Sequence, residues 1–138
     1  MFKKIVWATD GSEPADAAFE IAKSLASQDG SELIVVHSVE RIAARGGYTV
    51  DADQDEHQVK VKRQAQELAA SGVRTTVQLT EGVSGAAHRI AEVAEKEDAD
   101  LIIVGTRGRN PFAGLIVGSV TQRILHLAPC PVLVVPTK

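Results

Sequence analysis

The clearest indication of the fold is the stretch LIIVGTRGRNPFAGLIVGSVT, residues 101–121, in which a short apolar run passes into a glycine-rich segment. Residues 101–104 are continuously aliphatic, which is typical of a parallel strand that helices bury on both faces. Four more strands are predicted, at residues 5–8, 33–39, 75–79 and 132–135. Because residues 75–79 alternate between apolar and polar side chains, we expect that strand at an edge of the sheet.

Between the predicted strands, apolar residues recur at helical spacing. The predicted helices cover residues 15–26, 61–69 and 86–94, and a fourth runs from Gly118 and Ser119 to Pro129. Ser12 is the expected N-cap of the first helix, with Pro14 in its first turn. The alternation predicts a three-layer α/β/α sandwich on a five-stranded parallel sheet with right-handed crossovers. We expect a single domain over residues 1–138.

Composition and charge narrow the class of protein. Fifteen Lys and Arg residues against eighteen Asp and Glu residues leave a formal net charge of −3, which argues against binding to nucleic acid. No apolar run approaches the roughly 18–20 residues that span a bilayer, so we expect no membrane partner and a cytoplasmic location. The single cysteine, Cys130, cannot form an internal disulfide, and we expect it to behave as a small buried apolar residue.

Residues 40–55, from Glu40 to Asp55, have no consistent period and contain two adjacent glycines. They are expected to form a loop. Loops of this length are often lids over a site, but an insertion without a function remains an equal alternative.

In doubly wound sheets, ligands bind outside the carboxyl ends of the strands, where the strand order reverses. The loops after residues 5–8 and 101–104 are therefore the candidate ligand loops. Residues 105–121 hold four glycines, two arginines and a helix start, which are the parts of an anion-binding cradle. The alternative is a flexible glycine loop that only connects strand to helix. Neither the Walker A motif nor the dinucleotide fingerprint is present.

The spacing Gly105-x2-Gly108-x9-Gly118-Ser119 resembles the ATP-binding signature of the universal stress protein family, G-x2-G-x9-G-[ST]. The resemblance extends over essentially the whole chain, including the strand end Thr9-Asp10-Gly11-Ser12 and the closing residues 128–135. It implies a Rossmann-like fold of the adenine nucleotide alpha hydrolase-like type, with strand order 3-2-1-4-5. It also implies ATP as the ligand, alone or with Mg²⁺.

The resemblance also implies which residues surround the nucleotide. Asp10 and Val39 would hold the adenosine, with Ala8 and Thr9 beside Asp10. Around the ribose and phosphates it places Gly105, Gly108, Arg109, Gly118, Ser119, Val120 and Thr121. The residue types agree with these roles, because a carboxylate can accept from a ribose hydroxyl or an adenine amino group, and hydroxyls lie beside exposed helix amides.

Several of these residues have a second interpretation. Asp10 could instead form an Asx-turn or cap the first helix, and Arg107 and Arg109 could be solvated surface charges. A Mg²⁺ ion bridged to phosphates could bind Asp10, although a lone carboxylate is weak support for a metal site. The loop contains no lysine and no catalytic base is evident, so binding is better supported than turnover.

The residues and the resemblance together predict an ATP-binding, nucleotide-responsive stress protein with at most slow ATP hydrolysis. The alternative is a dimeric adaptor of the same fold that binds no nucleotide. The apolar strand at residues 132–135 should lie at an edge, where antiparallel pairing would give a homodimer unless a helix shields it. Trp7 is expected in the core, no zinc site is assigned to the histidines, and any protein partner is unknown.

Overall fold

The computed structural model describes residues 1–44, 47–50, 54–83, 85–106 and 118–137. Its strands are β1 (Lys4–Thr9), β2 (Glu32–Ala44), β3 (Gly47–Val50), β4 (Arg74–Gly82), β5 (Leu101–Gly105) and β6 (Val132–Val135). Its helices are the short 3₁₀ helix η1 (Glu13–Ala15), α1 (Asp16–Asp29), α2 (Gln54–Ala70), α3 (Ala86–Lys96) and α4 (Ser119–Leu127). All five predicted strands and all four predicted helices are therefore present.

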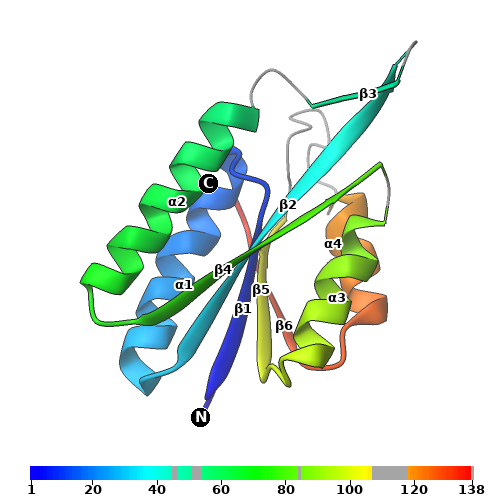
Figure 1. Ribbon diagram of the computed structural model, residues 1–138. Coiled ribbons are helices and arrows are strands. Elements are labelled where there is room, and N and C mark those ends of the chain that lie inside the picture. The colour runs from blue at the N-terminus through cyan, green and yellow to red at the C-terminus, as the bar shows by residue number, and fades with distance from the viewer. Residues whose placement is uncertain (45–46, 51–53, 84, 107–117, 138) are drawn as a thin grey trace.

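Five of the strands form one parallel sheet in the order β4-β2-β1-β5-β6. Counted among the parallel strands alone this order is 3-2-1-4-5, as the family resemblance implied. Helices α1 and α2 cover one face of the sheet, and α3 and α4 cover the other (Figure 1). The predicted three-layer, Rossmann-like sandwich is confirmed.

Each face of the sheet carries its own apolar core, because side chains along a strand alternate between the two faces. On β1, Ile5 and Trp7 pack toward α1 and α2, whereas Val6 and Ala8 pack toward α3 and α4. Trp7 is fully buried, as expected, and its ring lies 5.4 Å from that of Phe19 between centroids.

The expectation of a loop over residues 40–55 is wrong for the part that the structure describes. Strand β2 continues to Ala44 and pairs antiparallel with β3, from Arg41 opposite Val50 to Ala44 opposite Gly47. This hairpin extends beyond the carboxyl ends of the neighbouring strands (Figure 1). Residues 54 and 55 already belong to α2, and residues 45–46 and 51–53 lie outside the described residues. Residues 40–55 have no consistent period in the sequence, so periodicity alone does not predict this hairpin.

The start of the first helix differs in detail from the prediction. Ser12 has the extended backbone of an N-cap, with φ −73° and ψ 160°, but its side chain makes no cap hydrogen bond. Its hydroxyl donates instead to Asp10, and one turn of 3₁₀ helix precedes α1. At the other end α1 terminates at Gly30, whose φ of 65° is a left-handed conformation that suits glycine.

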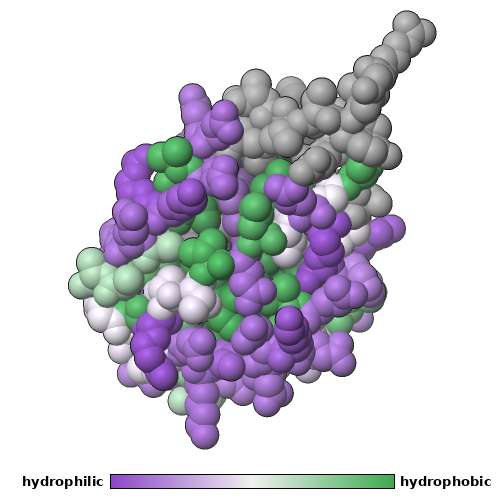
Figure 2. Space-filling model, in the orientation of Figure 1, coloured by the Kyte–Doolittle hydropathy of each residue, from purple (hydrophilic) through white to green (hydrophobic). Residues whose placement is uncertain are grey.

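The two edges of the parallel sheet expose apolar side chains. Within the described chain β4 pairs only with β2, which confirms the predicted edge, and Val77 and Leu79 on it are exposed. Figure 2 shows apolar side chains gathered in the middle of this face and framed by polar ones. At the opposite edge Leu133 of β6 is 37% exposed. None of the described helices is both long and apolar enough to cross a membrane.

Candidate functional site

The predicted site lies where the carboxyl ends of β1 and β5 meet. These strands are neighbours in the sheet, with Ile5 opposite Leu101 and Trp7 opposite Ile103, and they end at Thr9 and Gly105. The chain reaches β2 on one side of β1 and β5 on the other, so this is the point where the strand order reverses. The fold therefore brings together the two strand ends after which the sequence analysis placed the candidate ligand loops.

The turn after β1 is held by its own side chains. The Gly11 amide donates to Thr9 Oγ1 at 3.0 Å, and the Ser12 amide donates to Asp10 Oδ1 at 2.9 Å. The Ser12 hydroxyl also donates to Asp10 Oδ1. The Asx-turn interpretation of Asp10 is thus correct. Within the described part of the chain, both of these hydrogen bonds end on the same carboxylate oxygen, Oδ1. The turn leaves Oδ2 as the oxygen available to a ligand.

Gly11 is required at this turn for two reasons. Its φ of 81° lies in the left-handed region, and a Cβ atom there would stand 2.6 Å from the Cβ atom of His57 at the start of α2. Glycine therefore allows α2 to approach the turn that carries Asp10.

The amino end of α4 lies at the same end of the sheet, next to the carboxyl end of β5. Its N-cap is Gly118, which has no side chain to cap the helix, and the Gly118 amide donates to the Thr106 carbonyl at 2.7 Å. The first hydrogen bond within the helix runs from the Gln122 amide to the Gly118 carbonyl. The preceding amides, those of Ser119, Val120 and Thr121, consequently have no partner within the helix, and with the helix dipole they favour an anion.

Thr121 also has a role inside the protein. Its hydroxyl is buried and donates to the Gly105 carbonyl at 2.8 Å, which ties the first turn of α4 to the end of β5. The Thr121 hydroxyl is therefore already used inside the protein, and only the backbone amide of Thr121 joins those of Ser119 and Val120 at the start of the helix. Arg107, Gly108 and Arg109 lie outside the described residues, so their predicted placement has no geometry here.

Val39 and its neighbour Ser38 lie on opposite faces of the sheet. Along β2, Leu33 and Val35 pack toward α1 and α2, and Ile34 and Val36 pack toward α3 and α4. By this alternation Val39 falls on the first face and Ser38 on the face that α4 covers, and both are buried. The sequence analysis did not select Ser38, because the face of each residue is known only once the sheet is assembled.

His37 is a second residue that sequence reasoning missed as part of this region. It lies opposite Thr9 in the sheet, it is 2% exposed, and its Nε2 atom has no hydrogen-bond partner among the described residues. Burial lowers the pKa of His37, and the nearby Asp10 carboxylate opposes this effect. A buried histidine within an apolar strand gives no signal in the sequence beyond an interruption of the run.

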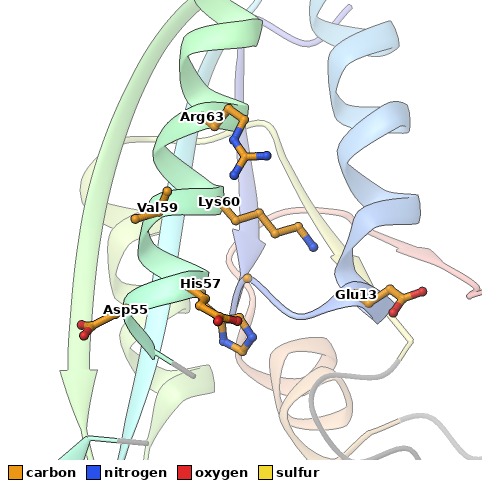
Figure 3. Close-up of a pocket in the computed structure, with 8 residues that line it drawn as sticks. Glu13, Asp55, His57, Val59, Lys60 and Arg63 are labelled. Carbon is orange, nitrogen blue, oxygen red and sulfur yellow. The ribbon is translucent and has the colours of Figure 1, made fainter. Parts of the chain in front are cut away.

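A cavity of about 670 Å³ opens between the Asp10 turn and α2. Gly11 and Glu13 line it on one side, and His57, Lys60 and Arg63 line it on the other. Figure 3 shows His57 and Lys60 pointing from α2 toward the segment with Glu13, while Asp55 and Val59 point away from it. The Lys60 amine forms an ion pair with Asp16 of α1, at 2.8 Å between Nζ and Oδ1. This cavity was not predicted, because it arises from the approach of α2 to Gly11.

Cys130 lies away from this edge and is partly buried against the α3 and α4 core. Its burial, together with the charge of Asp100, raises the pKa of the thiol. Within the described ranges no group of three or more His, Cys, Asp or Glu side chains is placed to hold a metal ion.

Comparison with known proteins places this geometry in a family. The family model for the universal stress protein family matches residues 1–136. A universal stress protein from Thermus aquaticus is 38% identical over 138 residues, which cover 98% of this chain and 99% of the relative. The solved structure of the hypothetical protein MJ0577 superposes with a TM-score of 0.81 at 26% identity and covers 100% of this chain and 98% of its own.

The universal stress protein from Archaeoglobus fulgidus, solved in complex with dAMP, has a TM-score of 0.72 and 25% identity, covering 96% of this chain and 97% of its own. The family match, the close relative and the shared fold agree over nearly the whole length of the chain. This chain belongs to the universal stress protein family.

Proposed function

We propose that this protein binds an adenine nucleotide, ATP in the first place, at the carboxyl ends of β1 and β5. The observation that carries the proposal is the amino end of α4. Gly118 gives it no side-chain cap, and its first amides stand beside the end of β5, where a phosphate group would complete them. The dAMP complex of the relative from Archaeoglobus fulgidus supports an adenine nucleotide as the ligand class.

In this proposal the phosphates lie at the amides of Ser119, Val120 and Thr121, with Gly118 allowing close approach. Further contacts to the phosphates and the ribose would come from Gly105 and from the motif residues Gly108 and Arg109, which lie outside the described ranges. Because the Asx-turn uses Oδ1, the Oδ2 atom of Asp10 would accept a hydrogen bond from a ribose hydroxyl or from the adenine amino group. Ala8 and Thr9 lead into that turn. Val39, within β2, would add buried apolar surface to the site.

A Mg²⁺ ion at this site would have to come with the nucleotide. The Asp10 carboxylate would supply one oxygen ligand, in place of its contact to the nucleoside, while Mg²⁺ prefers six oxygen ligands in an octahedron. The remaining ligands would be phosphate oxygens and water, as is usual for Mg²⁺ bound with nucleotides.

The protein would act through the bound nucleotide rather than by rapid turnover. The loop of residues 105–121 contains no lysine to neutralise the transferred phosphate. We propose a nucleotide-responsive regulator with at most slow hydrolysis, in which the bound ligand changes a surface that a protein partner recognises.

We further propose a homodimer through β6. In the described chain β6 pairs only with β5, so its other edge offers free backbone groups, and Leu125, Leu127 and Leu133 are exposed nearby. These same features would serve the alternative function, a dimeric adaptor that binds no nucleotide. Light scattering tests the interface: Leu133→Lys should convert a dimer to a monomer, and Val77→Lys on the opposite edge should not. A wild-type monomer would refute the proposed dimer.

Calorimetric titration with ATP and Mg²⁺ tests the nucleotide proposal. Gly118 has φ −60° and ψ 155°, which any residue can adopt, so Gly118→Val should fold normally while its side chain blocks the phosphates. Thr76→Val, on the exposed surface of β4, is the control for adding a valine elsewhere. Micromolar binding that Gly118→Val abolishes and Thr76→Val keeps would support the proposal. No binding by the wild type would favour the adaptor.

A further inference from the structure

The cavity between α2 and the Asp10 turn adjoins the proposed nucleotide site, yet none of the proposed phosphate contacts uses it. Gly11, which follows Asp10 in the turn after β1, lines one side of it, and α2 lines the other. Helices α2 and α4 pack on opposite faces of the sheet (Figure 1). The cavity therefore lies on the far side of the Asp10 turn from the amino end of α4.

The charges around the cavity disfavour phosphate groups. Its lining carries three carboxylates and only two cations: Glu13, Asp55 and Glu56 against Lys60 and Arg63. One of these cations, Lys60, already pairs with Asp16 of α1. The amino end of α4, in contrast, favours an anion. A nucleotide with its phosphates at α4 and its ribose at Asp10 would therefore direct its uncharged base toward the cavity.

Lys60 is the polar group that the structure holds in a fixed place on the α2 wall. Its Nζ atom lies 2.8 Å from Oδ1 and 2.9 Å from Oδ2 of Asp16. The side-chain amide of Gln64 lies 3.4 Å from Asp16 Oδ1, so α2 contacts this carboxylate at two positions. Figure 3 shows Lys60 pointing from α2 into the space beside Gly11 and Glu13.

The ion pair leaves Lys60 with a donor for a ligand. A lysine ammonium group has three N–H donors, and the two oxygens of Asp16 engage two of them. The Lys60 side chain is 29% exposed, so a molecule in the cavity can reach the third. The ring nitrogens of adenine are hydrogen-bond acceptors, and a bond from a charged donor is stronger than one between neutral groups.

We propose that Lys60 is a base-contacting residue of the nucleotide site: Asp16 fixes its amine on the cavity wall, and one N–H donates to a ring nitrogen of the base. The inference rests on the proposed function, because the direction of the base follows from phosphates bound at α4.

The chain offers a closely matched control for this residue. Lys23 of α1 forms an ion pair with Glu67 of α2, at 3.2 Å, and its side chain is 30% exposed. Lys60→Met and Lys23→Met each remove one lysine and one ion pair between the same two helices, but only Lys60 lines the cavity. Partly exposed pairs contribute little to stability, so thermal unfolding should show both variants folded, with small and similar shifts of the midpoint.

Two probes, each with Mg²⁺, separate the base from the rest of the nucleotide: ATP, and ribose 5-triphosphate, which lacks only the base. Calorimetry should show that Lys60→Met binds ATP about tenfold more weakly than the wild type, which corresponds to about 1.4 kcal/mol. Its affinity for ribose 5-triphosphate should stay within about twofold of the wild type. Lys23→Met should stay within about twofold for both probes.

Three results would overturn the proposal while leaving the proposed function intact. The first is an unchanged ATP affinity of Lys60→Met. The second is an equal loss for both probes, because Lys60 would then act on the phosphates through its charge. The third is the same loss of ATP affinity in Lys23→Met, because the pairing of α1 with α2 would then matter rather than a contact to the base.

Amide chemical shifts of the wild type give a second readout. ATP should shift the amides of Val59, Lys60 and Val61 as well as those at the amino end of α4, whereas ribose 5-triphosphate should shift only the latter. Shifts at α4 without any at α2 when ATP binds would overturn the base contact alone. If neither probe binds or shifts the α4 amides, the proposed function fails and the base contact fails with it.

Discussion

Replacing Gly11 by alanine tests the contact that joins α2 to the Asp10 turn. An L-residue at φ 81° is strained by about 1–2 kcal/mol. The added Cβ would also stand 2.6 Å from His57 Cβ and 3.1 Å from His57 Cα. Because the second atom belongs to the backbone, a change of rotamer cannot relieve the contact, and overpacking of this kind costs about 1–3 kcal/mol more.

Gly30 provides a matched control. Its φ is 65°, and nothing lies within 4 Å of a Cβ added there, so Gly30→Ala should lose only the conformational part, about 1–2 kcal/mol. Gly11→Ala should lose about 2–5 kcal/mol in total. Gly72, with φ 89° and equally open space, is a second control that should behave like Gly30.

Urea unfolding followed by circular dichroism measures the difference. With a denaturant slope of about 2 kcal/mol per molar, Gly11→Ala should unfold about 0.5–1.5 M urea earlier than Gly30→Ala. Equal midpoints for the two variants would refute the reasoning, since they would mean that α2 does not press on the turn.

Two other predictions concern single hydrogen-bonded side chains. Thr121→Val should lower the free energy of unfolding by about 1–3 kcal/mol, because the Gly105 carbonyl loses a buried donor. Calorimetry should show unchanged ATP affinity, because the backbone amide of Thr121 remains. A large loss of affinity at unchanged stability would contradict this division of roles. Asp100 accepts from the amides of Lys3 and Lys4, and these bonds lower its pKa from the usual value, so its stabilising effect is present above about pH 4 and is lost as the pH falls through the folded-state pKa. Urea unfolding should therefore show that Asp100→Asn is less stable than the wild type at pH 7, and that this difference in stability disappears toward pH 2. A difference that does not change with pH would contradict a stabilising role for the Asp100 charge.

The sheet was predictable because burial leaves a local record in the sequence. Residues 101–104 are buried on both faces, and their continuous aliphatic run is typical of that environment. The edge position of β4 was likewise visible in the alternation at residues 75–79. The hairpin of β2 with β3 left no such record, since neither residues 40–44 nor 47–50 read as a strand with one buried face.

The candidate site was predictable as a set of loops but not as a set of contacts. The spacing of Gly105 and Gly118 indicated the carboxyl end of the strand at residues 101–104 as the place of the site. The two roles of Thr121, and the orientation of Ser38 toward the α4 side, depend on which strand face meets which helix. The position of His37 opposite Thr9 depends on strand register, which a single sequence does not reveal.

The most direct test of the proposed nucleotide site is an amide chemical-shift titration of the wild-type protein with ATP and Mg²⁺. The account predicts the largest shifts at Ser119, Val120 and Thr121, with smaller ones at Asp10 and Ser12. Shifts confined to the cavity residues of α2, from His57 to Arg63, would contradict it by placing the ligand between α2 and the Asp10 turn, away from the amino end of α4. An unchanged spectrum at millimolar ATP would contradict nucleotide binding altogether.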